Sequence, residues 1–115
     1  MKLPEHPVFI ANFSVNMNKS IDGLCLIISG VLGKNPTEPG LYVFLNQARN
    51  RVKILYWERN GFCLWYKRLE KEKFKFPPQE GEIIRLEPRQ LEWLLAGLDF
   101  TKLQGHQRLN YSTFG

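Results

Sequence analysis

The stretch KILYWERNGFCLWYKRLEK, residues 53–71, decides the fold, because an Asn-Gly pair in it separates two runs of aromatic and aliphatic residues. An Asn-Gly pair between alternating runs is the strongest short-range signal of a β-hairpin. The sequence therefore predicts two antiparallel strands, 51–58 and 62–70, which meet at the turn Arg59-Asn60-Gly61.

Two registers of this hairpin are open. A two-residue type I′ loop would set Arg59 opposite Phe62, whereas a three-residue loop with a bulge at Gly61 would set Glu58 opposite Phe62. The second register separates the side chains better by character. One face would then form a core, from Val52, Ile54, Tyr56, Phe62, Leu64 and Tyr66. The other would mix cations with two tryptophans, and comprises Arg51, Lys53, Leu55, Trp57, Cys63, Trp65, Lys67 and Leu69.

Positive charge is concentrated on the same segment. The chain has 16 Lys and Arg residues against 11 Asp and Glu residues, a formal net charge of +5. Segment 49–75 holds nine of the cations and three of the anions, so its net charge is +6 and the rest of the chain carries −1. In the preferred register Lys53 would face Lys67, and like charges directly across a ladder repel each other. The charge therefore indicates an anionic partner, or a surface kept soluble by its own repulsion.

Cations interleaved with planar aromatic rings are typical of nucleic-acid surfaces, because Lys and Arg neutralise phosphates and Trp stacks on bases. In a second interpretation Trp57 and Trp65 cover a second small core, since tryptophan is mostly buried. The candidate residues for nucleic-acid binding are Arg51, Lys53, Trp57, Trp65, Lys67 and Arg68.

Two helices are predicted around the hairpin. The first is expected to have Asn16 as its N-cap and Gly33 at its C-terminal end. The second opens at Glu87-Pro88, where proline in the first turn costs nothing. Trp93 lies beside the apolar stripe of this helix, where it would either contact a protein partner or pack against the tail or a neighbouring loop. The apolar stripes are Ile21, Leu24, Ile28 and Leu32 in the first helix, and Leu91, Leu94, Leu95 and Leu98 in the second.

Further strands are predicted at 8–13, 41–45, 74–76 and 82–86. With tight hairpin connections, the pattern predicts an α+β fold, in which an antiparallel β-meander of four to six strands packs with two helices that cover one face. A length of 115 residues fits a single domain. We expect that domain over residues 1–100 and a polar C-terminal tail over residues 101–115.

Several classes of function are disfavoured. No apolar run approaches the roughly 20 residues of a membrane span, and residues 1–7 lack a signal-peptide core, which predicts a cytoplasmic protein with no membrane partner. Cys25 and Cys63 are expected to be reduced thiols, and neither His6 nor His106 has a ligand at metal-binding spacing. Without a phosphate loop or a nucleophile elbow, the sequence predicts no enzyme, no cofactor and no small-molecule substrate.

The run KILYWERNGFCLWYKRLEKEKFKFP, residues 53–77, resembles the small accessory protein of insertion sequence family sixty-six. That protein is encoded by the second open reading frame of the element and is often called TnpB. Three further segments resemble the family in the family's order: KSIDGL at 19–24, LYVFLN at 41–46 and LEWLLAGLDF at 91–100.

The resemblance implies an accessory protein of a bacterial mobile element, which acts in transposition beside a separate transposase as its partner. It adds no catalytic residues. Asn16 and Asn18 stand where the family usually has an acid and an arginine, and Gln47 stands where it has a basic residue. The family context leaves two functions open: DNA contact through the basic hairpin, or a protein-interaction module in which the Trp face or Trp93 docks on the transposase or on a second copy of the chain.

Overall fold

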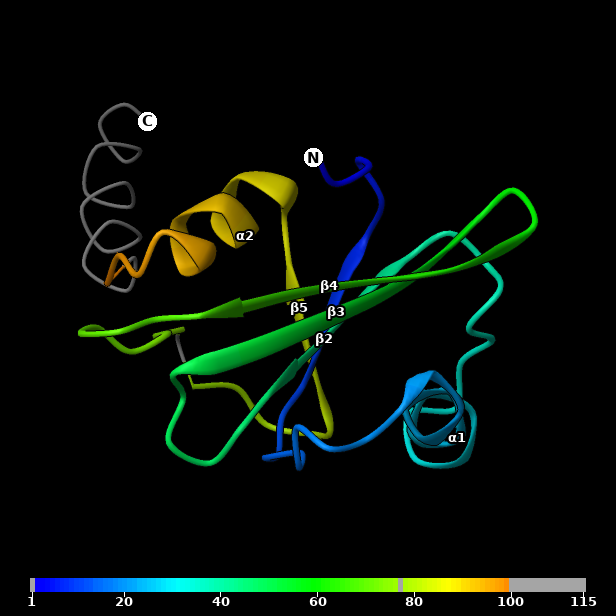
Figure 1. Cartoon of the computed structure of the whole chain (residues 1–115), viewed down its shortest axis with the longest axis horizontal. Helices are drawn as coiled ribbons and strands as arrows, with labels where there is room; N and C mark the ends of the chain where they lie inside the picture. Colours follow the sequence, from blue (N-terminus) through cyan, green and yellow to red (C-terminus); the bar gives the residue numbers. More distant parts are fainter. Residues whose placement is uncertain (1, 77, 100–115) are drawn as a thin grey trace.

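The structure is a computed structural model, which describes residues 2–76 and 78–99. The expected tail, residues 101–115, lies outside the described residues. Five strands and two helices make up the described part (Figure 1). They follow the chain in the order β1 Val8–Ala11, α1 Ile21–Gly30, β2 Leu41–Leu45, β3 Arg51–Glu58, β4 Gly61–Arg68, β5 Ile83–Leu86 and α2 Pro88–Leu95.

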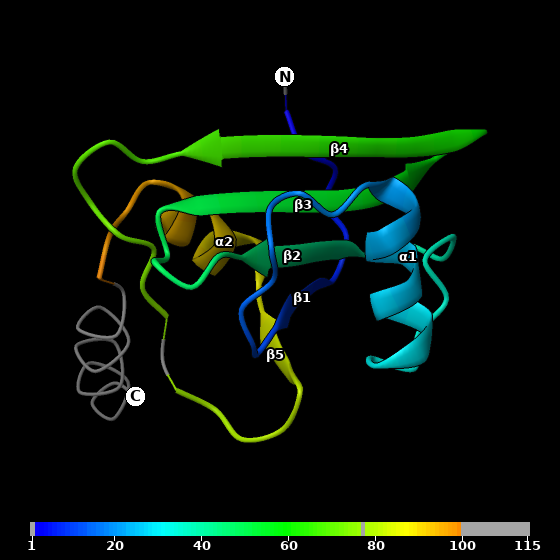
Figure 2. The same cartoon turned by 60° about the horizontal axis from the view of Figure 1, so that its bottom comes forward.

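The strands form one mixed sheet in the order β4-β3-β2-β1-β5, which Figure 2 shows spread from top to bottom, with α1 in front of it. β1 and β2 are parallel, with Val8 beside Leu41, and the other neighbours are antiparallel. The α+β class is confirmed, but the sheet is not a strict meander. The reason is that α1 carries the chain back across the sheet, so that β2 starts level with β1.

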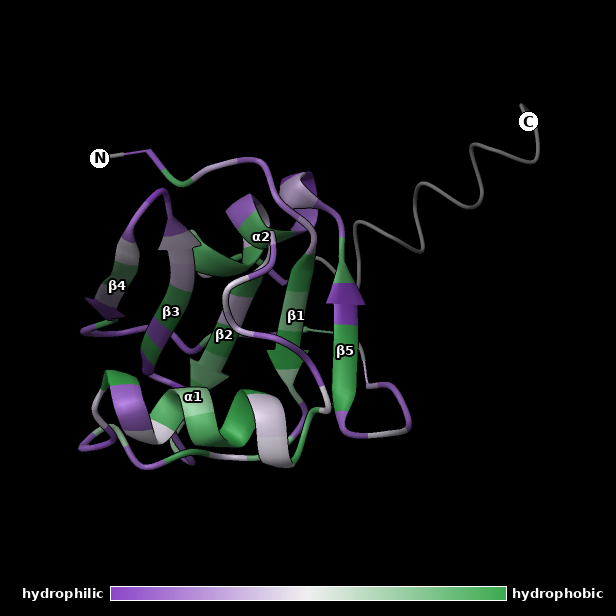
Figure 3. Ribbon diagram, turned by 90° about the vertical axis from the view of Figure 1, so that its right-hand side faces the viewer, coloured by the Kyte–Doolittle hydropathy of each residue, from purple (hydrophilic) through white to green (hydrophobic). Residues whose placement is uncertain are grey.

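The two helices lie on opposite faces of the sheet (Figure 1). The prediction that both cover one face is wrong. β1 and β2 are buried at every position, and alternate residues of a strand point to opposite faces, so both faces need an apolar cover. Hydrophobic colour accordingly runs through β1 and the middle of β3 (Figure 3).

Each helix closes its own core. On one face Leu24 and Ile28 of α1 pack with Phe9, Phe44 and Leu55. On the other face the α2 residues Leu91 and Leu94 pack with a set that includes Val8, Val43, Ile54, Phe74 and Ile84. Hereafter the two sides of the sheet are called the α1 face and the α2 face.

The first helix begins four residues later than the expected Asn16 cap predicts. Ser20 is the N-cap, and its hydroxyl accepts a hydrogen bond from the Gly23 amide at 3.3 Å. The Asn16 carboxamide oxygen accepts a bond from the Asn18 amide at 2.7 Å, so Asn16 closes a turn ahead of the helix. Gly33 follows the helix with φ +65°, which is the left-handed conformation expected of a residue that stops a helix.

The other predicted boundaries are close to those observed. β2 and β3 agree with the prediction, and β1 ends at Ala11 instead of residue 13. Residues 74–76 are not a strand, although the Phe74 amide donates to the Arg49 carbonyl at 2.8 Å and the Phe74 ring is fully buried. Leu98 lies beyond the end of α2 and is 46% exposed. No helix in the described part is long and apolar enough to cross a membrane.

Replacement of Leu24 tests the packing of α1 against the sheet. Leu24 is fully buried, so Leu24→Ala is expected to lower the free energy of unfolding by about 2–5 kcal/mol, because it leaves a cavity. Leu26 lies on the same helix and is 72% exposed, so Leu26→Ala should change that free energy by less than about 0.5 kcal/mol. Urea denaturation measures both. Equal losses in the two variants would contradict the observed orientation of α1.

Candidate nucleic-acid interface

The hairpin closes in a register that differs from both of those open to the sequence. Glu58 pairs with Gly61 and Trp57 pairs with Phe62, so Arg59 and Asn60 alone form the loop. Arg59 has φ +56°, and positive φ at the first loop residue alone is characteristic of a type II′ turn. Both predicted registers are wrong because they placed Gly61 in the loop, whereas Gly61 pairs with Glu58. The separation of faces that favoured the second register also fails, since β4 contributes apolar side chains to both cores.

A slip of one residue moves every side chain of a strand to the other face. Compared with the preferred register, each side chain of β4 therefore lies on the opposite face of the sheet relative to β3. Lys53 therefore faces Tyr66 rather than Lys67. The α1 face of the hairpin carries Arg51, Lys53, Leu55 and Trp57 from β3, with Phe62, Leu64, Tyr66 and Arg68 from β4. The α2 face carries Val52, Ile54 and Tyr56, with Cys63, Trp65 and Lys67.

The structure thus divides the six candidate residues between two faces. Four of them, Arg51, Lys53, Trp57 and Arg68, lie on the α1 face, whereas Trp65 and Lys67 lie on the α2 face. The two tryptophans do not share a surface, which corrects the predicted mixed face. Both are half-buried rather than fully exposed.

The two candidates on the α2 face contact α2 and its core. Trp65 packs against the α2-face core and lines a hollow of about 230 Å³ with Leu3, Leu91 and Leu95. Lys67 Nζ donates to the Leu95 carbonyl at 2.9 Å. That carbonyl belongs to the last residue of α2, where the helix dipole favours a cation. Both residues therefore attach α2 to the hairpin.

Four cations on the hairpin side of the α1 face form a basic patch, defined here as Lys19, Arg51, Lys53 and Arg68. Lys53 Nζ donates to the Lys19 carbonyl at 3.0 Å, which brings the entry of α1 onto β3. The Lys19 stem lies over Gly23, since a Cβ at Gly23 would stand 3.2 Å from Lys19 Cδ. Glycine at this position therefore makes room for Lys19.

Arg51 and Arg68 face each other directly across the ladder. The Leu69 amide donates to the Asn50 carbonyl at 2.8 Å, so the neighbouring Arg51–Arg68 pair is a non-hydrogen-bonded pair, in which side chains come closest. Both arginines are exposed. Arg68 Nε donates to Glu70 Oε2 at 2.8 Å, and this bond raises the pKa of Arg68. The Arg51 guanidinium has no such acid among the described residues.

Two aromatic residues extend the basic patch along the hairpin. Trp57 stands edge-on to Phe62, with ring centroids 4.9 Å apart and an interplanar angle of 77°. Tyr66 lies opposite Lys53 and is 48% exposed. The preferred register predicted Tyr66 in the core, which is wrong, because the observed register places it on this surface.

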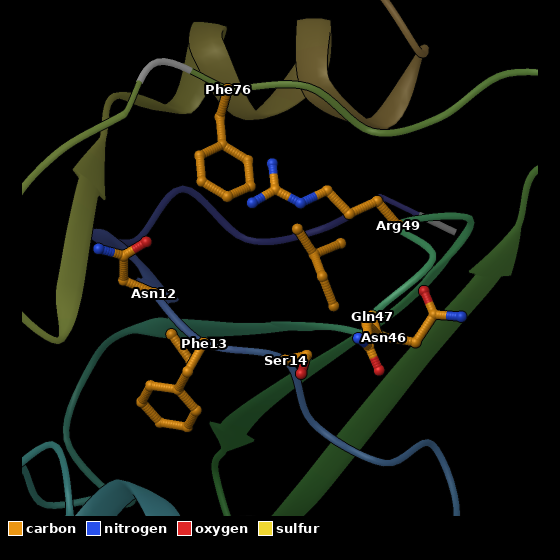
Figure 4. A pocket seen from close by; sticks show the side chains of 9 residues that line it. Asn12, Phe13, Ser14, Asn46, Gln47, Arg49 and Phe76 are labelled. Carbon is orange, nitrogen blue, oxygen red and sulfur yellow. The ribbon is translucent and has the colours of Figure 1, made fainter.

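Two neighbouring hollows adjoin the basic patch where the parallel strands β1 and β2 end. Their volumes are about 190 and 480 Å³, and they share Ser14, Asn46 and Gln47. Figure 4 shows the smaller one, in which the Arg49 guanidinium lies 4.4 Å from the centre of the Phe76 ring. The larger one is called the amide groove, and its polar lining consists of Ser14, Asn16, Asn18, Asn46, Gln47 and Arg51.

The amide groove gathers amide side chains from two loops that are far apart in the chain. Asn16 and Asn18 come from the loop before α1, and Gln47 comes from the turn between β2 and β3. Asn46 holds that turn, because its Oδ1 accepts from the amides of Asn50 and Arg51 at 3.1 and 3.0 Å. No local pattern in the sequence indicates that these distant segments meet, since their contact requires β1 and β2 to be parallel.

No group of three or more His, Cys, Asp and Glu among the described residues could hold a metal ion. Burial raises the pKa of the Cys25 thiol, and the Asp22 carboxylate raises it further. Cys25 is therefore held as a thiol at neutral pH, which is the weaker nucleophilic form.

The family described as "IS66 Orf2 like protein" matches residues 6–105. The chain belongs to this family. Two uncharacterized proteins of Sinorhizobium fredii (strain NBRC 101917 / NGR234) are similar: y4hO is 34% identical over 93 residues, 81% of each chain, and y4jC is 29% identical over 97 residues, 84% of this chain and 83% of its own. No solved structure matches significantly.

Membership of the IS66 Orf2-like family confirms the resemblance inferred from the hairpin and the other three segments. It associates the protein with transposition in an accessory role. The matched range includes every strand and both helices, so the basic patch and the amide groove lie inside the region that defines the family.

Replacement of Lys67 tests whether its bond to α2 stabilises the fold. Lys67→Met keeps the apolar stem and removes the bond to the Leu95 carbonyl, so we expect the free energy of unfolding to fall by about 1–2 kcal/mol. Lys71→Met removes the same charge at an exposed position beyond β4 and should cost less than about 0.5 kcal/mol. Urea denaturation would show equal small losses if the Lys67 bond contributes nothing.

Proposed function

We propose that this protein is a non-enzymatic accessory factor in the transposition of a bacterial insertion sequence, and that it contacts DNA through its basic patch. It acts in the cytoplasm beside the transposase of the same element. Family membership supports the transposition context. The observation that carries the DNA contact is the direct opposition of Arg51 and Arg68 on the exposed part of the α1 face.

Two guanidinium groups held opposite each other repel, and the Glu70 carboxylate, which accepts from Arg68 Nε, offsets only one of the two charges. A phosphate between them relieves that repulsion, because arginine binds phosphate oxygens in a bidentate manner. Lys53 lies two residues along on the same face, and Trp57 lies farther along toward the turn, where a ring can meet a sugar or base. Lys67 and Trp65 act in this proposal only through the fold.

Removal of one arginine tests the phosphate contact. Arg51→Ala is expected to weaken binding to duplex DNA by about tenfold at low salt, since a charge-assisted hydrogen bond is lost. The slope of log K against log salt should become shallower by about 0.9, the contribution of one phosphate. Fluorescence anisotropy of a labelled duplex across a salt series measures both quantities.

Arg89→Ala is the matched control, because Arg89 is an exposed arginine on α2, at the opposite face of the sheet. It changes the net charge equally and should leave the slope unchanged. A wild-type protein that fails to bind duplex DNA at low salt would refute the proposal, as would equal losses in the Arg51 and Arg89 variants.

A second candidate function rests on the free edge of β4. This strand has one neighbour in the sheet, so its outer backbone groups have no partner in the described part of the chain. The alternation of the ladder directs the amides and carbonyls of Phe62, Leu64, Tyr66 and Arg68 to that edge. An exposed edge of eight residues can accept an extended strand of the transposase or of a second copy of this chain.

Proline at Leu64 tests this edge. Leu64→Pro removes an outward amide that β3 does not use, so strand addition should be lost. Co-purification of the transposase after nuclease treatment, and light scattering of the protein alone, measure the two forms of association. If the folded Leu64→Pro variant still associates, the β4 edge is excluded as the binding surface. If that variant still binds DNA, the two candidate functions are separable.

A further inference from the structure

The amide groove lies at the carboxyl ends of two parallel strands, which is where open sheets with parallel strands place their ligands. Ser14 and Asn18 follow β1, and Gln47 follows β2. The parallel pairing of β1 and β2 brings both following segments to the same end of the sheet, as Figure 4 shows for Ser14, Asn46 and Gln47.

Several polar groups of this groove have no internal role. Asn46 is fully used, since it accepts from two backbone amides and its Nδ2 donates to Asn50 Oδ1 at 2.8 Å. In contrast, the side chains of Ser14, Asn18 and Gln47 make no hydrogen bond to another described residue. A carboxamide presents a donor beside an acceptor, which matches the edge of a nucleobase.

The charge of the groove favours a ligand that carries phosphate. No Asp or Glu is among the described residues that line either hollow, whereas Arg51 lines the amide groove and Arg49 lines its neighbour. Arg51 also belongs to the basic patch, so the groove is continuous with the proposed DNA contact. Neutral hydrogen-bonding side chains in a hollow that an arginine also lines fit a nucleotide unit, which joins a base to a phosphate.

The shape of the groove favours a single strand. The amide groove is a hollow of about 480 Å³ between two loops, within the range of about 300–1,000 Å³ common for small-ligand sites. Bases in a duplex are stacked, and they are read by elements that project into the major groove. A hollow cannot project, so only an unstacked base can enter it.

We propose that the amide groove holds an unstacked base of single-stranded DNA, with Gln47 and Asn18 on the base edge and Arg51 on the adjoining phosphate. This inference rests on the proposed function, because it shares Arg51 with the basic patch. It adds a preference for single strands and for particular bases, which phosphate contacts alone do not give.

The test compares labelled oligodeoxyadenylate, labelled oligodeoxythymidylate and a labelled duplex by anisotropy at one salt concentration. The wild type is expected to bind one of the single strands at least about threefold more tightly than the other, because their base edges differ. The double variant Asn18→Leu/Gln47→Leu keeps side-chain size and removes both amides. It should bind the preferred strand about tenfold more weakly, lose the base preference and bind the duplex as the wild type does.

Gln79→Leu is the control for the same chemical change, because Gln79 is exposed and lines neither hollow. The inference would be overturned by an unchanged base preference in the double variant, or by no preference in the wild type. In either case the Arg51→Ala result on duplex DNA still decides the proposed function. No binding of any DNA by the wild type would refute both.

A measurement on the wild type avoids any effect of substitution on folding. In proton–nitrogen spectra, deoxyadenosine monophosphate or deoxythymidine monophosphate should shift the side-chain amide signals of Asn18 and Gln47, and inorganic phosphate should not. Equal shifts with inorganic phosphate would show that the groove binds an anion and not a base, and would overturn the inference. No shift with any of the three would overturn it as well.

Discussion

The fold depends on one constraint: the central strands are buried on both faces, so each face must be covered by a separate apolar layer. α1 covers one face and α2 covers the other, and the hairpin adopts the register that gives apolar side chains to both. Phe62 and Leu64 extend the α1 side, whereas Cys63 and Trp65 extend the α2 side. Because the side-chain period of a strand is two, that choice also fixes where every charged residue of β4 lies.

The same constraint divides the basic residues of the hairpin between structure and surface. Lys53 and Lys67 lie on opposite faces, and each donates to a backbone carbonyl, one before α1 and one at the end of α2. Both lysines thus help to hold a helix on its face of the sheet. Arg51 and Arg68 remain on the exposed end of the ladder. Net charge alone would count all four as available to an anionic partner, although both lysines donate to backbone carbonyls and Arg68 is paired with Glu70.

The parallel pair of strands adds a second consequence. A meander would have distributed the segments after β1 and β2 to opposite ends of the sheet. The crossover through α1 instead places Asn16, Asn18 and Gln47 around one hollow, beside Arg51. The amide groove and the basic patch therefore arise from different features of one sheet, yet they share an arginine and form a continuous polar surface.

Local signals in the sequence predicted much of the fold. Asn-Gly located the hairpin to within a residue, the apolar stripes located both helices, and the specific segments 19–24, 41–46, 53–77 and 91–100 identified the family. The candidate site was predicted only in part: Arg51, Lys53, Trp57 and Arg68 share a face, but Trp65 and Lys67 do not, and Tyr66 and the amide groove were missed.

What the sequence by itself determined is therefore the set of elements, their approximate bounds and the family, because these depend on turn chemistry, on hydrophobic spacing and on short motifs that neighbouring residues carry. The tertiary structure alone decided the register of the hairpin, the placement of the helices on opposite faces and the meeting of the loops after β1 and β2. The physical reason is that these features depend on which apolar surfaces bury one another across the sheet, and pairs far apart in the chain leave no local pattern.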